Sequence, residues 1–197
     1  MDRIIENELI DKCINKEASS QMQLYNKYAS QMYALCLRFV RVNSEADDLL
    51  QDGFIKVFEN ISSFRRECSL ESWIKRIMVN NAVNHYKKNS SHFYDIDVDS
   101  LINLTEEEEE NLNFIEDDEG ELEELPNEIV LKLIQELPEG KKMIFNLYVI
   151  ENYSHKEIAE MLNISVSTSK SQLAKAKMIL KEKLMKIHIK KYHENKV

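Results

Sequence analysis

Three carboxylates stand close enough together in this sequence to form a divalent-metal site, as in a metal-dependent nuclease. Asp47, Asp48 and Asp52 share neighbouring turns of a predicted helix, and carboxylate oxygens are preferred ligands of Mg²⁺ and Ca²⁺. No histidine or second acidic motif accompanies them, and Gln51 stands among them. We therefore expect no metal here and interpret the cluster as an acidic face that is either solvated or bound by a partner.

No other residues have the spacing of a catalytic or cofactor site. The five histidines are scattered, and no Ser/His or Cys/His arrangement suggests covalent catalysis. Cys13, Cys36 and Cys68 are odd in number and lack metal-ligand spacing, which indicates reduced thiols in a cytoplasmic protein. The sequence predicts neither an enzyme nor a bound cofactor.

Basic and amide side chains follow one face of a helix predicted from Ser69 to Asn89. Ser69 caps this helix, and its buried side is formed by apolar residues at helical spacing, among them Trp73, Ile74 and Met78. The opposite side carries Lys75, Arg76, Asn80, Asn81, Asn84, Lys87 and Lys88. Such side chains suit phosphates and base edges of nucleic acid, although a polar surface helix explains them equally well when the helix is taken alone.

The segment from Tyr153 to Leu184 has the pattern of a helix-turn-helix. Ser154 and Glu157 have the spacing of a capping box, and Asn163 tolerates the left-handed backbone of a tight turn. Ser165 can then cap a second, basic helix with Val166 as its first apolar position. This arrangement indicates DNA binding through the second helix, with an ordinary helical hairpin as the alternative.

These residues require helices to position them, and helical periodicity covers most of the remaining chain. One helical pattern runs from Asn7 to about Val42. A second helix, capped by Ser44, is predicted to end at Asn60, and a loop with Phe64, Arg65 and Arg66 follows it. Only three Gly and two Pro occur, which indicates an all-α protein. Gly53 lies inside a helix at a cost of about 1 kcal/mol relative to Ala, which indicates a close neighbour.

The charge is divided unevenly along the chain. The total is −9, but residues 1–88 carry +1, residues 89–131 carry −16 and residues 132–197 carry +6. An acidic stretch of this kind repels itself and cannot bury a core. We predict two helical domains, 1–89 and 127–190, joined by a flexible acidic linker, 90–126, and followed by a basic tail, 191–197. No run is apolar enough to insert into a membrane, and the N-terminus lacks a secretory signal.

Two blocks in this order resemble a known family. The block EADDLLQDGFIKVFEN…NNAVNHYKK (Glu45–Lys88) is similar to region 2, and LPEGKKMIFNLYVI…AKAKMILKEKL (Leu137–Leu184) is similar to region 4, of RNA polymerase sigma factors. The chain resembles the extracytoplasmic-function class of the sigma-70 superfamily. A helix-turn-helix alone is weakly specific, whereas two such blocks joined by a variable linker are highly specific.

The resemblance implies promoter DNA and core RNA polymerase as partners, the latter through the clamp of its largest subunit and the flap of its second-largest. An anti-sigma protein is also expected from the family. The residues that match the clamp-binding face are Asp47, Asp48, Gln51, Asp52 and Phe54. A second set of residues matches the part of the family's region 2 that opens the duplex and recognises the −10 element. These residues are Phe64, Arg65, Arg66, Ser69, Arg76, Asn80, Asn84, Lys87 and Lys88. Those expected to contact the −35 element are Ser167, Thr168, Lys170, Ser171, Gln172 and Lys175.

Two further expectations follow. The acidic linker takes the place of the segment that passes through the polymerase's active-site and RNA-exit channels, where its charge would mimic RNA. The alternative function is an autonomous helix-turn-helix regulator with an N-terminal dimerisation or ligand domain. Such a regulator should be dimeric and should bind a palindromic duplex tightly without polymerase.

Overall fold

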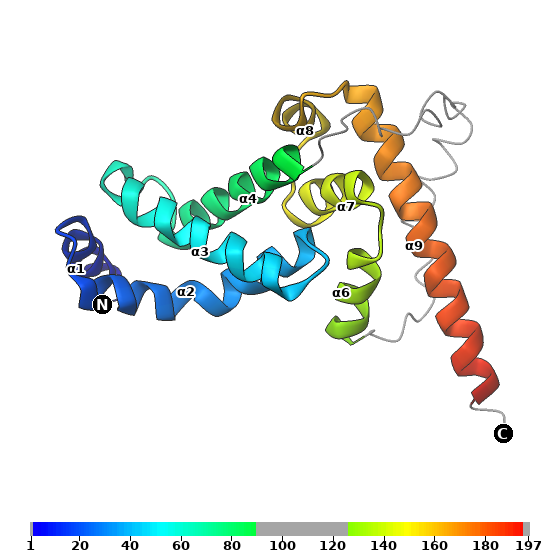
Figure 1. The fold of residues 1–197 in the computed structure, drawn as a ribbon, viewed down its shortest axis with the longest axis horizontal. Coiled ribbons are helices and arrows are strands. Elements are labelled where there is room, and N and C mark those ends of the chain that lie inside the picture. Colours follow the sequence, from blue (N-terminus) through cyan, green and yellow to red (C-terminus); the bar gives the residue numbers. More distant parts are fainter. Residues whose placement is uncertain (1, 90–125, 195–197) are drawn as a thin grey trace. The chain divides into compact units, whose positions relative to one another are not determined.

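The structure is a computed structural model that describes residues 2–89 and 126–194, with side chains for residues 5–89 and 126–187 (Figure 1). Every regular element in these ranges is a helix, which confirms the all-α prediction. The chain divides into two compact units, Met1–Asn89 and Ser90–Val197. The linker expected at residues 90–126 lies, except for Pro126, outside the described residues. Within the described ranges, no helix combines the length and apolarity that crossing a membrane requires.

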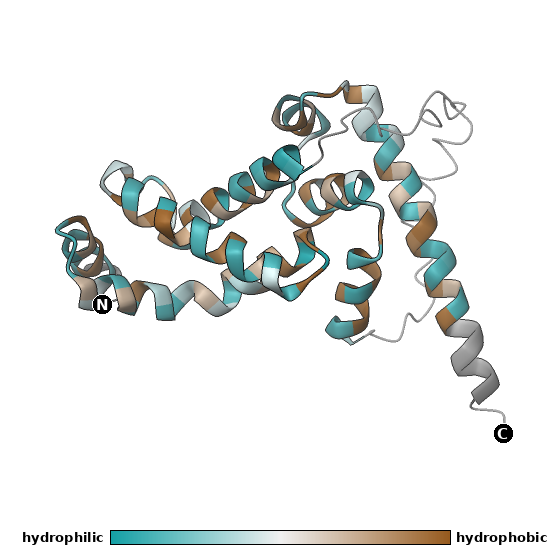
Figure 2. Ribbon diagram, viewed as in Figure 1, coloured by the Kyte–Doolittle hydropathy of each residue, from teal (hydrophilic) through white to brown (hydrophobic). Residues whose placement is uncertain are grey.

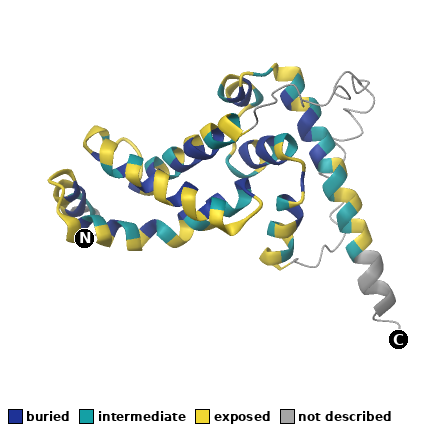
Figure 3. Ribbon diagram, viewed as in Figure 1, coloured by how far each residue is buried: buried dark blue, intermediate teal, exposed yellow. Residues whose placement is uncertain are grey.

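The first unit is a small helical bundle. Its elements are α1 (Asp2–Ile14), α2 (Ala18–Phe39), α3 (Asn43–Asn60), the 3₁₀ helix η1 (Ile61–Ser63) and α4 (Leu70–Asn89). Helices α2, α3 and α4 pack against one another, while α1 packs against α2 and η1 (Figure 1). Their facing sides hold the buried residues, and the outward sides are exposed (Figure 3). The apolar stripe predicted for α2 is buried at Leu24, Tyr28, Met32, Leu35 and Phe39.

Two helix boundaries differ from the sequence prediction. The pattern expected to run unbroken from Asn7 to Val42 is interrupted at Lys16, whose left-handed φ of 61° separates α1 from α2. The prediction that Ser44 caps α3 is also wrong. The carbonyl of Val42 already accepts hydrogen bonds from the backbone N–H groups of Glu45 and Ala46, so the N-cap is Val42, two residues before Ser44, and α3 begins at Asn43.

The close neighbour predicted at Gly53 is Met78. A Cβ atom at position 53 would lie 2.1 Å from Met78 Sδ and 2.8 Å from its Cε. Met78 is itself buried on α4. Because Gly53 has no side chain, α3 leaves room for the long Met78 side chain of α4, and the two helices can pack closely.

The second unit surrounds the first half of a long helix. Its elements are α6 (Asn127–Gln135), α7 (Glu139–Phe145), the π-helical segment η4 (Asn146–Ile150), α8 (His155–Leu162) and α9 (Val166–Glu194). Helices α6, α7 and α8 contact α9, whose C-terminal part extends beyond them (Figure 1). The brown, apolar sides of α7 and α8 face the unit's interior (Figure 2). The core contains Leu133, Leu137, Met143, Ile144, Leu147, Ile158, Leu162, Leu173 and Ala176.

Two large apolar residues of this unit lie at its surface. Tyr148 is 37% exposed and Val166 is 42% exposed. Val166 is the first residue of α9, so it precedes the turns of α9 that α8 covers. Tyr148 instead lies on η4 with its ring against His155.

Candidate nucleic-acid and partner interfaces

An acidic face occupies one side of α3. Asp48, Gln51 and Asp52 are all exposed, and their spacing of three and four residues aligns them along the helix. Asp47 is exposed beside them. Ile55 continues the same line and is 56% exposed, an apolar residue at the end of an acidic row. Ile55 is not among the predicted contact residues, although its position seven residues after Asp48 could have revealed it.

Phe54 does not belong to this face, which corrects its predicted role as a polymerase contact. Its side chain is 2% exposed, and its ring lies 4.7 Å from that of Tyr25 and 6.1 Å from that of Phe58. A ring packed between α2 and α3 presents almost no surface to a partner. Phe54 instead holds α3 against α2, which orients the acidic face.

The neighbouring helix α4 presents a polar face of different character. Arg76, Asn80, Asn84 and Lys88 are exposed at intervals of four residues, with Lys87 half-buried beside them. Asn81, which the sequence placed on the same side, is buried. Its Nδ2 donates to the carbonyl oxygen of Leu49 at 3.0 Å, and its Oδ1 accepts a hydrogen bond from Lys56 Nζ. Asn81 therefore holds α4 against α3. Asn80 and Asn84 are exposed and can contact a ligand.

The loop between α3 and α4 is anchored at several points. The Phe64 ring is half-buried, 5.3 Å from that of Trp73. Arg65 is exposed, while Arg66 forms an ion pair with Asp11 of α1. Ser69 Oγ accepts the backbone N–H of Ser72 and so caps α4, as predicted. Nothing in the sequence indicated the pairing with Asp11, because the two residues are far apart in the chain.

The helix-turn-helix is formed by α8 and the start of α9. Ser154 and Glu157 make the predicted capping box, and Asn163 has the predicted left-handed conformation, with φ 56° and ψ 48°. Ser165 Oγ accepts the backbone N–H of Thr168 at 2.9 Å and caps α9. Ile158, Ala159 and Leu162 bury the apolar side of α8. Both predicted helices and the turn between them are confirmed.

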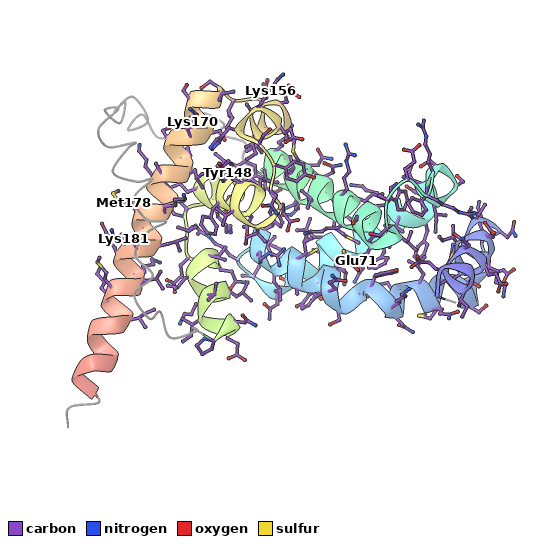
Figure 4. All side chains as sticks on the ribbon, turned by 180° about the vertical axis from the view of Figure 1, so that it is seen from behind. Glu71, Tyr148, Lys156, Lys170, Met178 and Lys181 are labelled. Carbon is purple, nitrogen blue, oxygen red and sulfur yellow. The ribbon has the colours of Figure 1, made fainter. Side chains whose placement is uncertain are left out.

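The residues predicted to contact the −35 element differ in exposure. Ser167 and Lys170 are exposed on the first turns of α9, while Thr168, Ser171 and Lys175 are half-buried. Gln172 is only 6% exposed, so the structure contradicts its selection as a DNA contact: its position on α9 faces the unit's interior. Lys156 of α8 is also exposed, and Figure 4 shows it at the same end of the unit as Lys170.

A polar cluster lies where η4, α8 and α9 meet. His155 Nδ1 is 2.9 Å from Ser169 Oγ, and Ser169 is fully buried. The His155 ring stacks on that of Tyr148, with centroids 4.3 Å apart and planes 22° apart. Burial, and then the positive charges of Lys170 and Lys177, lower the pKa of His155 below its ordinary value of 6.5. The imidazole is therefore held in its neutral form near pH 7.

Metal binding has no candidate in the described parts of the chain. Residues 5–89 and 126–187 contain no group of three or more His, Cys, Asp or Glu side chains placed to hold a metal ion. Asp47, Asp48 and Asp52 lie on an exposed helix surface.

Comparisons with known proteins match both units. The model of sigma-70 region 2 matches residues 24–92, and the model of sigma-70 region 4 matches residues 127–180. Together these segments cover more than half of the chain.

Two relatives match over most of the chain. The ECF RNA polymerase sigma-E factor of Haemophilus influenzae is 27% identical over 186 residues, covering 93% of this chain and 97% of the relative. The RNA polymerase sigma-H factor of Pseudomonas aeruginosa is 29% identical over 175 residues, covering 87% and 90%. Among solved structures, the sigma factor RpoE in complex with the anti-sigma factor NepR from Bartonella quintana matches with a TM-score of 0.49 and 17% identity, covering 83% of this chain and 96% of that one.

Proposed function

The chain belongs to the sigma-70 family and is an RNA polymerase sigma factor of the ECF type, and from this premise we propose which surfaces perform each step of transcription initiation. The observation that carries the proposal is the pair of faces on α3 and α4. An acidic face ending in an exposed isoleucine and a basic-amide face lie on neighbouring helices of one unit. One helix can therefore hold the polymerase while the next contacts DNA.

The acidic face of α3 binds the clamp of the polymerase's largest subunit. Asp47, Asp48, Gln51 and Asp52 supply charge and hydrogen-bond acceptors, and Ile55 supplies the apolar contact. Carboxylates at an interface contribute mainly to specificity and association rate, whereas a desolvated apolar anchor contributes mainly to affinity.

The loop and α4 open the duplex and recognise the −10 element. Extruding a base costs a few kcal/mol, which phosphate contacts and a binding pocket must offset. Arg65, Arg76, Lys87 and Lys88 provide the phosphate contacts, and Asn80 and Asn84 can each both donate and accept hydrogen bonds at a base edge. Phe64, Arg66 and Ser69 shape the loop. For Arg66 to reach DNA, it must exchange its ion pair with Asp11 for a phosphate.

The first turns of α9 recognise the −35 element. Ser167 and Lys170 lie where a recognition helix enters the major groove, with Thr168, Ser171 and Lys175 at its edges. Lys156 adds a phosphate contact from α8. The same unit binds the flap of the second-largest subunit.

The remaining assignments follow from family membership and sequence. The first domain is 1–89, the acidic linker 90–126, the second domain 127–190 and the basic tail 191–197. The linker's charge mimics RNA within the polymerase. The protein acts in the cytoplasm without enzymatic activity of its own, and an anti-sigma protein regulates it. An autonomous regulator is disfavoured because the chain matches region 2 as well as region 4.

The test uses two matched variants of the full chain. Ile55→Asp on α3 should weaken binding to core polymerase by about tenfold or more, because a charge replaces the apolar anchor. Met22→Asp on α2 is the control, since Met22 is 60% exposed and outside every proposed contact. Binding is measured by titrating labelled chain with core enzyme. Equal affinities for the two variants would reject the proposed clamp surface.

Transcription from a promoter library with randomised −35 and −10 elements tests the function as a whole. The reconstituted holoenzyme should start transcripts downstream of one preferred pair of elements, whereas core enzyme alone should show no preference. The absence of any preferred pair would overturn the assignment of both DNA-contacting surfaces.

A further inference from the structure

The turn between α8 and α9 fixes only one end of α8. Asn163 and Ser165 define that end through the left-handed turn and the α9 cap. The apolar contacts between the two helices, at Ile158, Ala159 and Leu162, are non-directional. A helix of eight residues is about 12 Å long, so a small rotation about the turn displaces its far end by several ångströms.

The far end of α8 has a directional contact of its own. His155 is the first residue of α8, and its Nδ1 is 2.9 Å from the hydroxyl of Ser169 on α9. A serine within a helix can satisfy its hydroxyl on the carbonyl four residues earlier. Here the hydroxyl instead lies within hydrogen-bond distance of a side chain on another helix, in a position that is fully buried.

A third element fixes the imidazole in place. The Tyr148 ring, on η4, stacks against the face of His155 while the ring edge contacts Ser169. The imidazole therefore has a fixed plane and a fixed hydrogen-bonding direction, which a histidine held by one contact lacks. The cluster links η4 and α8 to the turn of α9 that carries Lys170.

We propose that His155 and Ser169 are positioning residues for −35 recognition: their hydrogen bond sets the angle between α8 and α9 and so orients the recognition helix in the major groove. This inference rests on the proposed function of α9 and deepens it. Neither side chain touches DNA. Both act through the exposed residues Ser167 and Lys170, which follow any rotation of α9.

The experiment uses holoenzyme reconstituted from core polymerase and the full chain. Transcripts are counted from a promoter library in which the −35 element is randomised and the preferred −10 element is kept. Selectivity is the ratio of transcripts from the preferred −35 element to those from its single-base mismatches. Selectivity for the −10 element is measured in parallel, with −35 kept constant.

His155→Phe retains a ring against Tyr148 but removes the hydrogen bond, and Ser169→Ala removes only the hydroxyl. Each should lower −35 selectivity about fivefold, the equivalent of one lost hydrogen bond, and leave −10 selectivity unchanged. The double variant should lose no more than either single one, because both remove the same contact. His155→Asn should restore selectivity, since its amide lies where the Nδ1 atom was. Ser20→Ala, which removes a buried hydroxyl from the first unit, should leave both ratios unchanged.

The outcomes separate this inference from the function on which it rests. A wild-type holoenzyme with no −35 preference overturns the proposed role of α9, and the inference with it. Wild-type selectivity retained by folded His155→Phe and Ser169→Ala overturns the inference alone, even if both variants melt at lower temperature, because the bond then serves stability only. If His155→Phe does not fold, Ser169→Ala decides by the same criterion.

Discussion

Single residues in this protein are placed by what surrounds them in space. Phe54, Asn81 and Gln172 have side chains suited to binding a partner or DNA, yet each is buried. Asn81 uses both ends of its amide inside the bundle, on Leu49 and Lys56. Conversely, Ile55 has a core-forming side chain and is exposed. Side-chain chemistry alone therefore does not distinguish contact residues from packing residues.

The close contact between Gly53 and Met78 should determine how the protein responds to an alanine at position 53. Gly53→Ala gains about 1 kcal/mol of helix propensity but forces the end of the buried Met78 side chain to move, at about 1–3 kcal/mol, so the variant should gain no stability and should lose up to about 2 kcal/mol. In a Met78→Ala background the clash is absent, and the same change should stabilise by about 1 kcal/mol. Urea unfolding of the four proteins measures both effects. Equal effects in the two backgrounds would show that Met78 is not the neighbour that matters.

The three cysteines should differ in their reactivity toward thiol reagents. Burial raises the pKa of the Cys36 thiol to about 12 and also raises that of Cys13, so both remain protonated and shielded at pH 8. Cys68 is exposed in the loop before α4. A thiol reagent should therefore modify one cysteine quickly and the other two only on unfolding, as mass spectrometry of timed samples can show. Rapid modification of Cys36 in the folded protein would contradict its placement in the core.

Helices in this chain function as pairs. In the proposed function, helices α3 and α4 divide polymerase and DNA contacts between them, and Asn81 and the Gly53–Met78 contact hold the two helices together. In the same proposal α9 recognises DNA and α8 supports it, and the two helices are joined by a turn at one end and by His155 and Ser169 at the other. In each pair a buried polar bond adds direction to apolar packing, which by itself permits sliding and rotation.

The packing of α8 on α9 should depend on pH. The pKa of His155 is below 6.5 in the folded chain, chiefly through burial, while the unfolded chain protonates near 6.5. Its contribution to stability is complete above pH 6.5 and is lost as the pH falls from there toward the depressed folded value, because the unfolded state binds the extra proton. Calorimetry at pH 7.5 and 5.5 should show a larger drop in Tm for the wild type than for His155→Phe. An equal drop in Tm for the two proteins would exclude His155 as the source of the pH dependence.

Two lysines on α9 form a matched pair for testing the DNA contacts. Lys170 lies on the first turns of α9, and Lys181, about three turns further along the helix, points away from the rest of the unit (Figure 4). Lys170→Gln should reduce the slope of log affinity against log salt by about one unit for holoenzyme on promoter DNA. Lys181→Gln should leave the slope unchanged. The slopes come from binding isotherms at several salt concentrations. A larger change in slope for Lys181→Gln than for Lys170→Gln would contradict DNA binding by the first turns of α9.

The whole molecule is organised by its charge. Residues 1–88 and 132–197, which contain the proposed DNA-contacting surfaces, carry net charges of +1 and +6, and residues 89–131 between them carry −16. This division explains how a chain of net charge −9 can bind a polyanion. The acidic stretch repels DNA and is suited to positively charged surfaces of a protein partner.

The charge of the acidic linker, residues 90–126, is expected to act within the polymerase. Replacing Glu106–Glu110 with Gln removes five of its negative charges. If the charge mimics RNA inside the polymerase, the ratio of abortive to full-length transcripts should change while promoter affinity stays within about twofold. Gel analysis of transcripts and a promoter-binding assay give the two quantities. An unchanged transcript profile would remove the linker from promoter escape.

The sequence by itself determined that the chain is helical, the caps at Ser69, Ser154 and Ser165, and the division of charge. These depend on neighbours within a few residues, where hydrogen-bond geometry and periodicity act directly. The two blocks likewise sufficed to indicate the family. Tertiary structure alone decided that Phe54 and Gln172 face inward, that Arg66 pairs with Asp11, and that His155 meets Ser169. Each of these depends on which helix packs against which face, a choice made by the fit of whole surfaces rather than by local spacing.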